Sequence, residues 1–282
     1  MKIKQYRTQF IKELSPFYDA YEAESFFYLI LEDKHKLRQI DLALNHELFF
    51  SDVDLDIWEN LLIQLKKEVP IQYLLGKTSF YGLDFEVNEN VLIPRPETEE
   101  LVEWIINENI GRSKKIKILD IGTGSGCIAV SLAKNLPKAE VYAIDVSKKA
   151  IETAKRNAVN NNVEVTFMYQ DILVTDELKC KFDVIVSNPP YVRNLEKEEI
   201  KKNVLDYEPH LALFVDDNDA LVFYRKIASL AQNNLLPNGQ LYFEINQYLG
   251  KEMIDLLGKM DFINIDLRKD IYDNDRMIKV NI

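Results

Sequence analysis

Residues 116–126 carry the sequence IKILDIGTGSG, in which a short apolar run leads into a loop with three glycines. The run Ile116–Ile121 has the length and composition of a strand that is buried on both faces of a sheet. The next apolar segment, Ile128–Asn135, is expected to be a helix. Glycine lets a backbone turn tightly and approach a ligand closely, and free N–H groups at a helix start attract negative charge. The stretch therefore predicts a strand, a ligand-binding loop and a helix in that order.

Strands and helices alternate along the rest of the chain. A second helix is expected at Lys148–Asn160. The strands expected after the first are Glu140–Asp145, Val163–Phe167, Phe182–Ser187, Gln240–Ile245, Ile263–Leu267 and Met277–Ile282. Alternation of this kind predicts an α/β fold with a mostly parallel sheet covered by helices on both faces. Because no helix-length segment separates the last two strands, we expect them to form an antiparallel hairpin at one edge.

The first 93 residues have a different pattern. Apolar side chains recur every three or four positions up to residue 75, and no glycine precedes Gly76, which indicates a helical bundle. Residues 78–87 alternate with period two about Gly82, which predicts a β-hairpin. Pro96, followed by acidic residues, is typical of a helix start. We therefore expect a helical bundle at 1–75, a hairpin linker at 76–93 and an α/β domain at 94–282.

Composition and charge limit the classes of protein that fit. Of 282 residues, 47% are apolar, and no apolar run approaches the roughly 18 residues of a membrane span. The basic N-terminus is not followed by an apolar core, so we expect no secretory signal and a cytoplasmic location. The two cysteines and three histidines lack the spacing of metal ligands, so no metal site is expected. The net charge of −11 disfavours direct contact with nucleic acid and suits a basic partner, such as a ribosome-associated protein.

The spacing of the glycines in the loop limits the class of ligand that it can bind. A dinucleotide fingerprint requires glycine at position 127, where this chain has Cys127, and the P-loop lysine is absent. Asp145 ends the second strand, where a carboxylate can accept hydrogen bonds from ribose hydroxyls. Asp171 either approaches an adenine amine or is an exposed loop acid, and Ile172 packs either on adenine or in the core. The arrangement predicts an adenosyl ligand along the carboxyl edge of the sheet.

The segment Ser187-Asn188-Pro189-Pro190-Tyr191 follows the fourth expected strand, where ligands of open α/β sheets bind. Two consecutive prolines end the strand and make the turn rigid. Such a turn can offer the Asn188 side-chain oxygen and the Pro189 carbonyl to the two hydrogens of a planar NH2 group. The Tyr191 ring can stack on that group and exclude water. The alternative is a structural turn with a packed aromatic, but the glycine loop nearby favours methyl transfer to an amide or amine nitrogen.

Several segments together resemble the release factor glutamine methyltransferase family. They are PIQYLLG at 70–76, LIPRPETE at 92–99, the loop at 120–126, SNPPY at 187–191, Tyr207-Glu208-Pro209 with Ala212-Leu213, and DIYDNDR at 270–276. The first 70 residues match only in being helical and of suitable length. The resemblance implies a Rossmann-like class I S-adenosylmethionine-dependent methyltransferase sheet with a small N-terminal helical domain and a β-hairpin linker.

The resemblance also implies an activity. The expected reaction is methyl transfer from S-adenosylmethionine to the glutamine amide nitrogen in the Gly-Gly-Gln loop of class-1 peptide chain release factors, leaving S-adenosylhomocysteine. The helical bundle is expected to help hold the release factor. The residues expected at the cofactor are Gly122, Thr123, Gly124, Ser125, Gly126, Asp145, Asp171, Ile172 and Asn188. Those expected at the glutamine are Asn188, Pro189, Pro190 and Tyr191, of which Asn188, Pro189 and Tyr191 are the candidate catalytic residues.

Other readings remain open at this point. Asn-Pro-Pro-Tyr also occurs in a ribosomal-protein glutamine methyltransferase and in nucleic-acid adenine-N6 methyltransferases, because all of these act on a planar NH2 group. The segment Ile93–Glu99 discriminates against the adenine enzymes but does not separate the two glutamine substrates. A non-enzymatic nucleotide-binding scaffold would have no use for the rigid turn. Arg95 and Glu97 have no assigned chemistry, and a structural ion pair that braces the pocket is an equal alternative for them.

Overall fold

The protein is described by a computed structural model that covers residues 1–282. The chain divides into two compact units. The first comprises Met1–Gly76 and Lys202–Tyr207, and the second comprises Lys77–Lys201 and Glu208–Ile282. No helix in either unit has both the length and the apolar character needed to cross a membrane.

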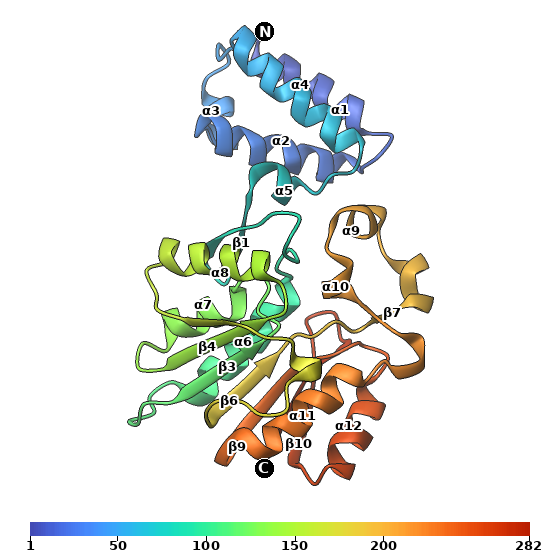
Figure 1. The fold of residues 1–282 in the computed structure, drawn as a ribbon. Coiled ribbons are helices and arrows are strands. Elements are labelled where there is room, and N and C mark those ends of the chain that lie inside the picture. Colours follow the sequence, from blue (N-terminus) through green and yellow to red (C-terminus); the bar gives the residue numbers. More distant parts are fainter. The chain divides into compact units, whose positions relative to one another are not determined.

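The first unit is helical, as the spacing of its apolar residues predicts (Figure 1). Its helices are α1 (Ile3–Leu14), α2 (Ala20–His35), α3 (Gln39–Leu44), α4 (Asp52–Lys66), α5 (Ile71–Leu75) and α9 (Lys202–Tyr207). Trp58 is fully buried at the centre, and the ring centroids of Phe27 and Phe10 lie 4.8 and 5.5 Å from its own. The Tyr207 hydroxyl donates to the Lys67 carbonyl (2.8 Å), which ties the late segment α9 to this unit.

The second unit begins with the expected hairpin, β1 (Lys77–Phe80) and β2 (Leu83–Glu86). Tyr81 and Gly82 at its tip both have positive φ angles, 49° and 71°. Two positive φ angles in a two-residue connection produce the type I′ turn that matches strand twist. Phe80 and Phe85 are buried in the core of this unit, so the hairpin is anchored by packing as well as by strand pairing.

A seven-stranded sheet forms the centre of the second unit. Its order is β10-β11-β9-β6-β3-β4-β5. The strands are β3 (Lys117–Ile121), β4 (Glu140–Asp145), β5 (Thr166–Tyr169), β6 (Phe182–Ser187), β9 (Leu235–Glu244), β10 (Ile263–Lys269) and β11 (Asp275–Asn281). The pairs among β5, β4, β3, β6 and β9 are parallel, while β10 and β11 form the predicted antiparallel hairpin at one edge. A separate parallel pair joins β7 (Val192–Arg193) to β8 (Phe214–Val215).

Most predicted strand boundaries agree with the observed ones to within two residues, but two strands begin three or more residues from their predicted starts. The third strand was expected at Val163–Phe167 but is Thr166–Tyr169, because Asn162 has a positive φ of 56° and the Val163 N–H still bonds back to Ala158. The strand expected at Gln240–Ile245 begins earlier, at Leu235, which pairs with Phe182 before a register shift. The first effect is a local helix end at Asn162 that the prediction overlooked, whereas the second depends on the pairing with β6.

Helices cover both faces of this sheet (Figure 1). One face packs against α6 (Pro96–Asn109), α7 (Cys127–Asn135) and α8 (Lys148–Asn160), and the other against α11 (Val222–Asn234) and α12 (Gly250–Lys259). Shorter helical turns are η1 (Ile172–Val174), η2 (Asn194–Glu199), α10 (His210–Leu213) and η3 (Asp217–Asp219). Pro96 occupies the first turn of α6, as predicted. Apolar residues on alternate positions of β3, β6 and β9 fill the two faces in turn, which is why these strands read as continuous apolar runs.

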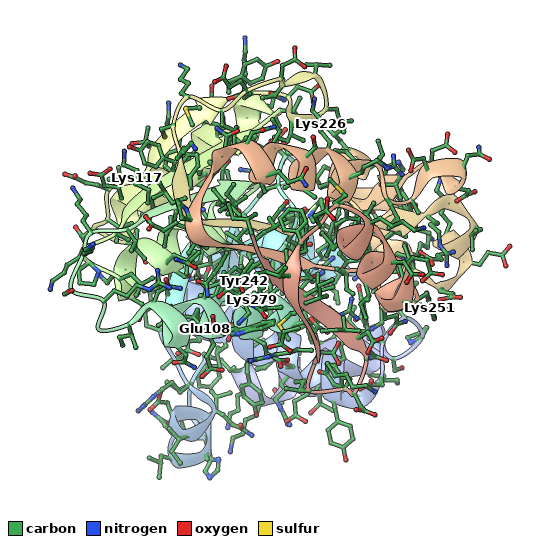
Figure 2. The ribbon with its side chains drawn as sticks, turned by 90° about the horizontal axis from the view of Figure 1, so that it is seen from below. Glu108, Lys117, Lys226, Tyr242, Lys251 and Lys279 are labelled. Carbon is green, nitrogen blue, oxygen red and sulfur yellow. The ribbon has the colours of Figure 1, made fainter.

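Glu108 in α6 is a hydrogen-bonding centre between this helix and the sheet (Figure 2). Its Oε1 accepts from Lys279 Nζ (2.6 Å) and Trp104 Nε1 (2.7 Å), and its Oε2 accepts from Gln240 Nε2 (2.7 Å) and the Tyr242 hydroxyl (2.9 Å). Burial opposes ionisation, but the bonds from Lys279, Trp104 and Tyr242 outweigh it and lower the pKa of Glu108. The carboxylate is therefore saturated and stabilising at neutral pH.

We expect Glu108→Ala to lower the free energy of unfolding by about 3 kcal/mol, because it takes the carboxylate partner from the largely buried Lys279 ammonium and from three other donors. Urea unfolding at pH 7 measures the loss, with the exposed Glu103→Ala on the same helix as control. A carboxyl with a lowered folded pKa stabilises above its ordinary value of about 4 and loses this effect as pH falls through the folded pKa. The difference between the wild type and Glu108→Ala should accordingly shrink below about pH 4. An equal loss in both variants at pH 7 would contradict the assignment.

Candidate active site

A cavity of about 160 Å³ lies in the second unit at the carboxyl ends of the parallel strands. The chain runs from β3 through β4 to β5 and then returns to β6, so the sheet order reverses between β3 and β6. Open α/β sheets bind ligands at such a reversal. Of the predicted site residues, Gly122, Gly124, Asp145, Asp171, Ile172, Asn188, Pro189 and Pro190 line the cavity. The predicted residues outside this wall are Thr123, Ser125, Gly126 and Tyr191.

The glycine loop has a conformation that other residues adopt at a cost. Gly122, Gly124 and Gly126 have φ angles of 76°, 54° and 83°. A Cβ at Gly122 or Gly124 would meet nothing within 4 Å, so the space above the loop is open to a ligand. A Cβ at Gly126 would lie 3.0 Å from the Ala154 Cβ, so this glycine permits the close packing of α7 on α8.

Thr123 and Ser125 contribute to the loop from inside. Both are buried, and the Thr123 hydroxyl donates to Asp120 Oδ2 at 2.6 Å. The Ser125 carbonyl accepts from Asn157 Nδ2 at 2.9 Å. These bonds hold the loop backbone between β3 and α8, so both residues shape the site and neither has its side chain in the cavity wall.

Asp145 ends β4 as predicted and joins the loop to the strand edge. Its Oδ2 accepts from the Gly124 N–H and its Oδ1 from the Ser147 N–H, both at 2.8 Å. Burial raises the pKa of Asp145, and the two backbone bonds oppose that rise. The carboxylate is thus held in place by backbone donors while it faces the cavity.

Asp120 is a buried acid that the prediction did not include among the site residues. It lies at the end of β3, is fully buried, and its Oδ1 has no hydrogen-bond partner. Burial raises the pKa of Asp120 to about 7, and the negative charge of Asp145 adds to this effect against the bond from Thr123. The sequence alone could have indicated Asp120 as a site residue, because an acid is unusual at the end of a buried strand just before a glycine loop.

The residues directly after β5 form another part of the cavity wall. Asp171 caps η1 by accepting from the Leu173 N–H (2.9 Å) and is partly exposed at the cavity edge. Ile172 is buried among the residues of the α11 face and also lines the cavity. The two alternatives for Ile172, packing in the core and lining the ligand cavity, therefore both apply, because the residue lies at the border between the core and the cavity.

The rigid turn follows β6 as predicted, and the Ser187 hydroxyl ties it to β3 by donating to the Ile121 carbonyl (2.7 Å). Asn188 Nδ2 donates to Thr98 Oγ1 (3.3 Å), and Pro189 and Pro190 complete this part of the wall. Tyr191 lies beside the wall, where its hydroxyl donates to Glu244 Oε1 (3.0 Å) and its ring packs against the α11 face. Burial raises the pKa of Tyr191 strongly, so the phenol is protonated at neutral pH.

Arg95 has a structural partner that the sequence did not reveal. Its Nη2 donates to Glu208 Oε1 at 2.7 Å, and the Ile93 N–H donates to Glu208 Oε2 at 3.1 Å. Glu208 is buried, so the ion pair fixes the segment before α6 against the segment that carries Glu208 and Pro209. An ion pair that braces the pocket was one of the two expectations for Arg95. Its partner is Glu208, 113 residues away, rather than Glu97.

A parallel sheet with a glycine loop, an acid at the end of the second strand and an Asn-Pro-Pro-Tyr turn at the point of reversal defines an S-adenosylmethionine-dependent methyltransferase. The methyltransferase small domain pattern matches residues 98–210. A release factor glutamine methyltransferase of Flavobacterium psychrophilum is 65% identical over all of this chain and 99% of its own length. One of Bacteroides thetaiotaomicron is 43% identical over 97% of this chain and 98% of its own. The chain belongs to the release factor glutamine methyltransferase family.

Solved structures agree on the fold. A methyltransferase from Pyrococcus furiosus matches 79% of this chain and 98% of its own, with a TM-score of 0.52 at 18% identity. At this identity the likeness concerns the fold alone, and the residues of the site have to be argued from this chain.

Proposed function

We propose that this chain transfers a methyl group from S-adenosylmethionine to the side-chain amide nitrogen of the glutamine in the Gly-Gly-Gln loop of class-1 peptide chain release factors. The observation that carries the proposal is the rigid turn at residues 188–190, which lies in the wall of the same cavity as the glycine loop. The names of the two relatives support the same substrate. The net charge of −11 favours a basic protein partner over nucleic acid, and a translation substrate suits a cytoplasmic location.

The cavity residues fit this cofactor. The open space above Gly122 and Gly124 admits a ligand against the backbone, and Asp145 lies in the cavity wall. Asp120 is buried outside that wall and is joined to the loop by the bond from Thr123. The carboxylate form of Asp120, buried against the loop, favours a ligand with positive charge at this end of the cavity. We propose that the loop Gly122–Gly126, Asp145, Asp171, Ile172 and Asn188 hold the cofactor.

The bound cofactor supplies an electrophilic methyl group on a sulfonium, so the reaction forms a C–N bond, breaks a C–S bond and leaves S-adenosylhomocysteine. The protein has to orient a weakly nucleophilic amide nitrogen. Asn188 Oδ1 and the Pro189 carbonyl would each accept one amide hydrogen, which directs the nitrogen lone pair toward the methyl group. Pro190 keeps the turn rigid, and the half-buried Tyr191 ring would limit water access from its side. The nitrogen then gives up one proton to solvent.

The helical unit at residues 1–76 is proposed to bind the release factor outside the Gly-Gly-Gln loop. Its exposed apolar side chains include Tyr21, Leu44 and Val53, each more than two thirds exposed. Exposed apolar residues scattered in this way are common on protein surfaces, so the proposal rests on the bundle being a compact unit of its own outside the methyltransferase domain. The division into bundle, linker and catalytic domain is then a division between substrate recognition and chemistry.

Incubating the purified protein with S-adenosylmethionine and an intact class-1 release factor, followed by peptide mass mapping, tests the function. One added methyl group on the Gly-Gly-Gln glutamine is the expected result, with Asn188→Ala protein as the inactive control. A methyl group found only on a ribosomal protein, or only on adenine in nucleic acid, would replace the proposed substrate with that one.

Cofactor binding should release protons near neutral pH. The pKa of Asp120 is about 7, and a cationic ligand above the loop favours the carboxylate, so binding lowers this pKa. At pH 6.5 we expect the calorimetric enthalpy of S-adenosylmethionine binding to depend on the ionisation enthalpy of the buffer, and affinity to fall as pH drops below 7. Asp120→Asn should remove a large part of the dependence on buffer and on pH. Asp145 is present in both proteins, so the difference between them reports on Asp120. The same buffer dependence in the two proteins would contradict the assignment.

A further inference from the structure

A chain of hydrogen bonds runs from the rigid turn into the core of the second unit. Asn188 Nδ2 donates to Thr98 Oγ1 (3.3 Å), and the Thr98 hydroxyl donates to Glu244 Oε2 (2.6 Å). The other carboxylate oxygen, Glu244 Oε1, accepts from the Tyr191 hydroxyl (3.0 Å). Three elements supply Asn188, Thr98 and Glu244, namely the turn after β6, the first turn of α6 and the end of β9.

The donors and acceptors in this series of hydrogen bonds run in one direction, because a carboxylate such as that of Glu244 only accepts hydrogen bonds. The single hydroxyl proton of Thr98 is used on Glu244, so Thr98 Oγ1 is left as an acceptor. An acceptor at this position selects the NH2 side of the Asn188 amide. The amide oxygen of Asn188 is thereby turned away from Thr98.

The orientation matters because the two ends of an asparagine amide have nearly the same shape. Rotation by half a turn about the Cβ–Cγ bond would present an NH2 donor in place of the oxygen. A glutamine substrate offers amide hydrogens to this wall, and two donors facing each other repel. The Asn188 side chain therefore works in only one of its two orientations.

Glu244 is held firmly enough to impose this direction. It is 1% exposed, and burial raises its pKa, while the bond from Thr98 and the charge of Arg276 oppose the rise. Arg276 is itself fixed by Asp270, whose Oδ2 accepts from its Nε at 3.0 Å. Arg276 Nη1 also reaches the Ile245 carbonyl (3.4 Å), directly after Glu244 in the chain.

We propose that Thr98 and Glu244 are positioning residues that set the orientation of the Asn188 amide and so present its oxygen to the substrate nitrogen. The inference rests on the proposed function, because it concerns the same turn and the same substrate amide. It gives a role to Thr98 in the segment at 92–99 and to Asp270 and Arg276 in the segment at 270–276. Both segments had been recognised in the sequence without an assigned chemistry.

Kinetics of Thr98→Val test the role, since valine has the shape of threonine without the hydroxyl. We expect kcat with release factor to fall roughly 10- to 100-fold, because the reacting groups are no longer held in the productive orientation. The dissociation constant of S-adenosylmethionine should stay within about twofold of wild type, and Thr98→Ser, which keeps the hydroxyl, should recover most of the activity. Thr153→Val is the control, because Thr153 is also buried and does not line the cavity. Its hydroxyl donates to the Lys149 carbonyl and accepts from Asn88 Nδ2 and Arg156 Nη2, none of which belongs to the chain of bonds from Asn188 to Glu244.

Glu244→Gln tests the direction of the chain. A glutamine amide at this position must point its NH2 group at one of the two hydroxyls, and toward Thr98 this reverses the hydroxyl and with it the Asn188 amide. We expect a loss of kcat similar to that of Thr98→Val, and no further loss in the double variant, because the effect of Glu244 passes through Thr98. Wild-type kcat in Thr98→Val, or losses that multiply in the double variant, would overturn the proposal.

A measurement without substrate separates this inference from the proposed function. The side-chain amide signals of Asn188 in a ¹⁵N spectrum can be assigned by their absence in Asn188→Asp, and they should shift in Thr98→Val but not in Thr153→Val. Unshifted signals in Thr98→Val would overturn the hydrogen-bond chain. Shifted signals, together with a wild-type protein that leaves release factor unmethylated, would support the positioning role and reject the proposed substrate.

Discussion

Asn188→Ala is expected to lower kcat for methyl transfer by roughly 100- to 1,000-fold, the range seen when one preorganised polar group is removed from a reaction site. The variant loses the side-chain oxygen that would accept an amide hydrogen of the substrate. The turn itself should persist, because Pro189 and Pro190 restrict its backbone and Ser187 still donates to the Ile121 carbonyl. Cofactor affinity should change by no more than a few fold, since the glycine loop and Asp145 are untouched.

Single-turnover rates with release factor, together with calorimetric titration of S-adenosylmethionine, measure both parts of this prediction. Asn234→Ala is the matched control. Asn234 lies at the end of α11 and is buried; its Nδ2 donates to the Leu178 and Cys180 carbonyls, and it does not line the cavity. A rate near that of the wild type in Asn188→Ala would remove Asn188 from the catalytic residues. A rate that fell equally in both variants would indicate a loss of folding instead.

Asp145→Ala is expected to weaken cofactor binding by roughly 10- to 100-fold, since hydrogen bonds to a charged group contribute about 1.5 to 3 kcal/mol each. The substitution removes the acceptor for the Gly124 N–H, so the glycine loop loses its connection to the end of β4. It also removes the carboxylate proposed to accept from the ribose hydroxyls. Both losses act on the bound state of the cofactor, so the dissociation constant should rise more than kcat falls.

The control for Asp145 lies at the opposite end of the same sheet. Asp183 at the start of β6 also accepts from a backbone N–H, that of Lys117, at 2.7 Å. Asp183→Ala should therefore cost stability without changing the dissociation constant of S-adenosylmethionine. Equal affinity of wild type and Asp145→Ala for the cofactor would contradict the ribose assignment.

The elements of the fold were predictable because local sequence specifies them. The helix Lys148–Asn160 was predicted with the boundaries that the structure has, because Ser147 caps its start and its apolar residues recur at helical spacing. The hairpin about Gly82 and the start of α6 at Pro96 follow from residues with a restricted or unusual backbone. The glycine loop, Asp145 and the Asn-Pro-Pro-Tyr turn were placed at one edge for the same reason, since each comes directly after a strand of a parallel sheet.

The partners of these residues were decided by the tertiary structure. Thr98 and Glu244 are 146 residues apart in the chain, and Arg95 and Glu208 are 113 apart. No periodicity or propensity relates positions at such separations, because their contact depends on how α6 packs against β9 and on where the segment after α9 returns to the second unit. The sequence by itself placed the glycine loop, Asp145 and the turn at residues 188–190 at one edge of the sheet. Packing of distant elements determined how the amide of Asn188 is turned, because a hydrogen bond has a direction that only its partner can set.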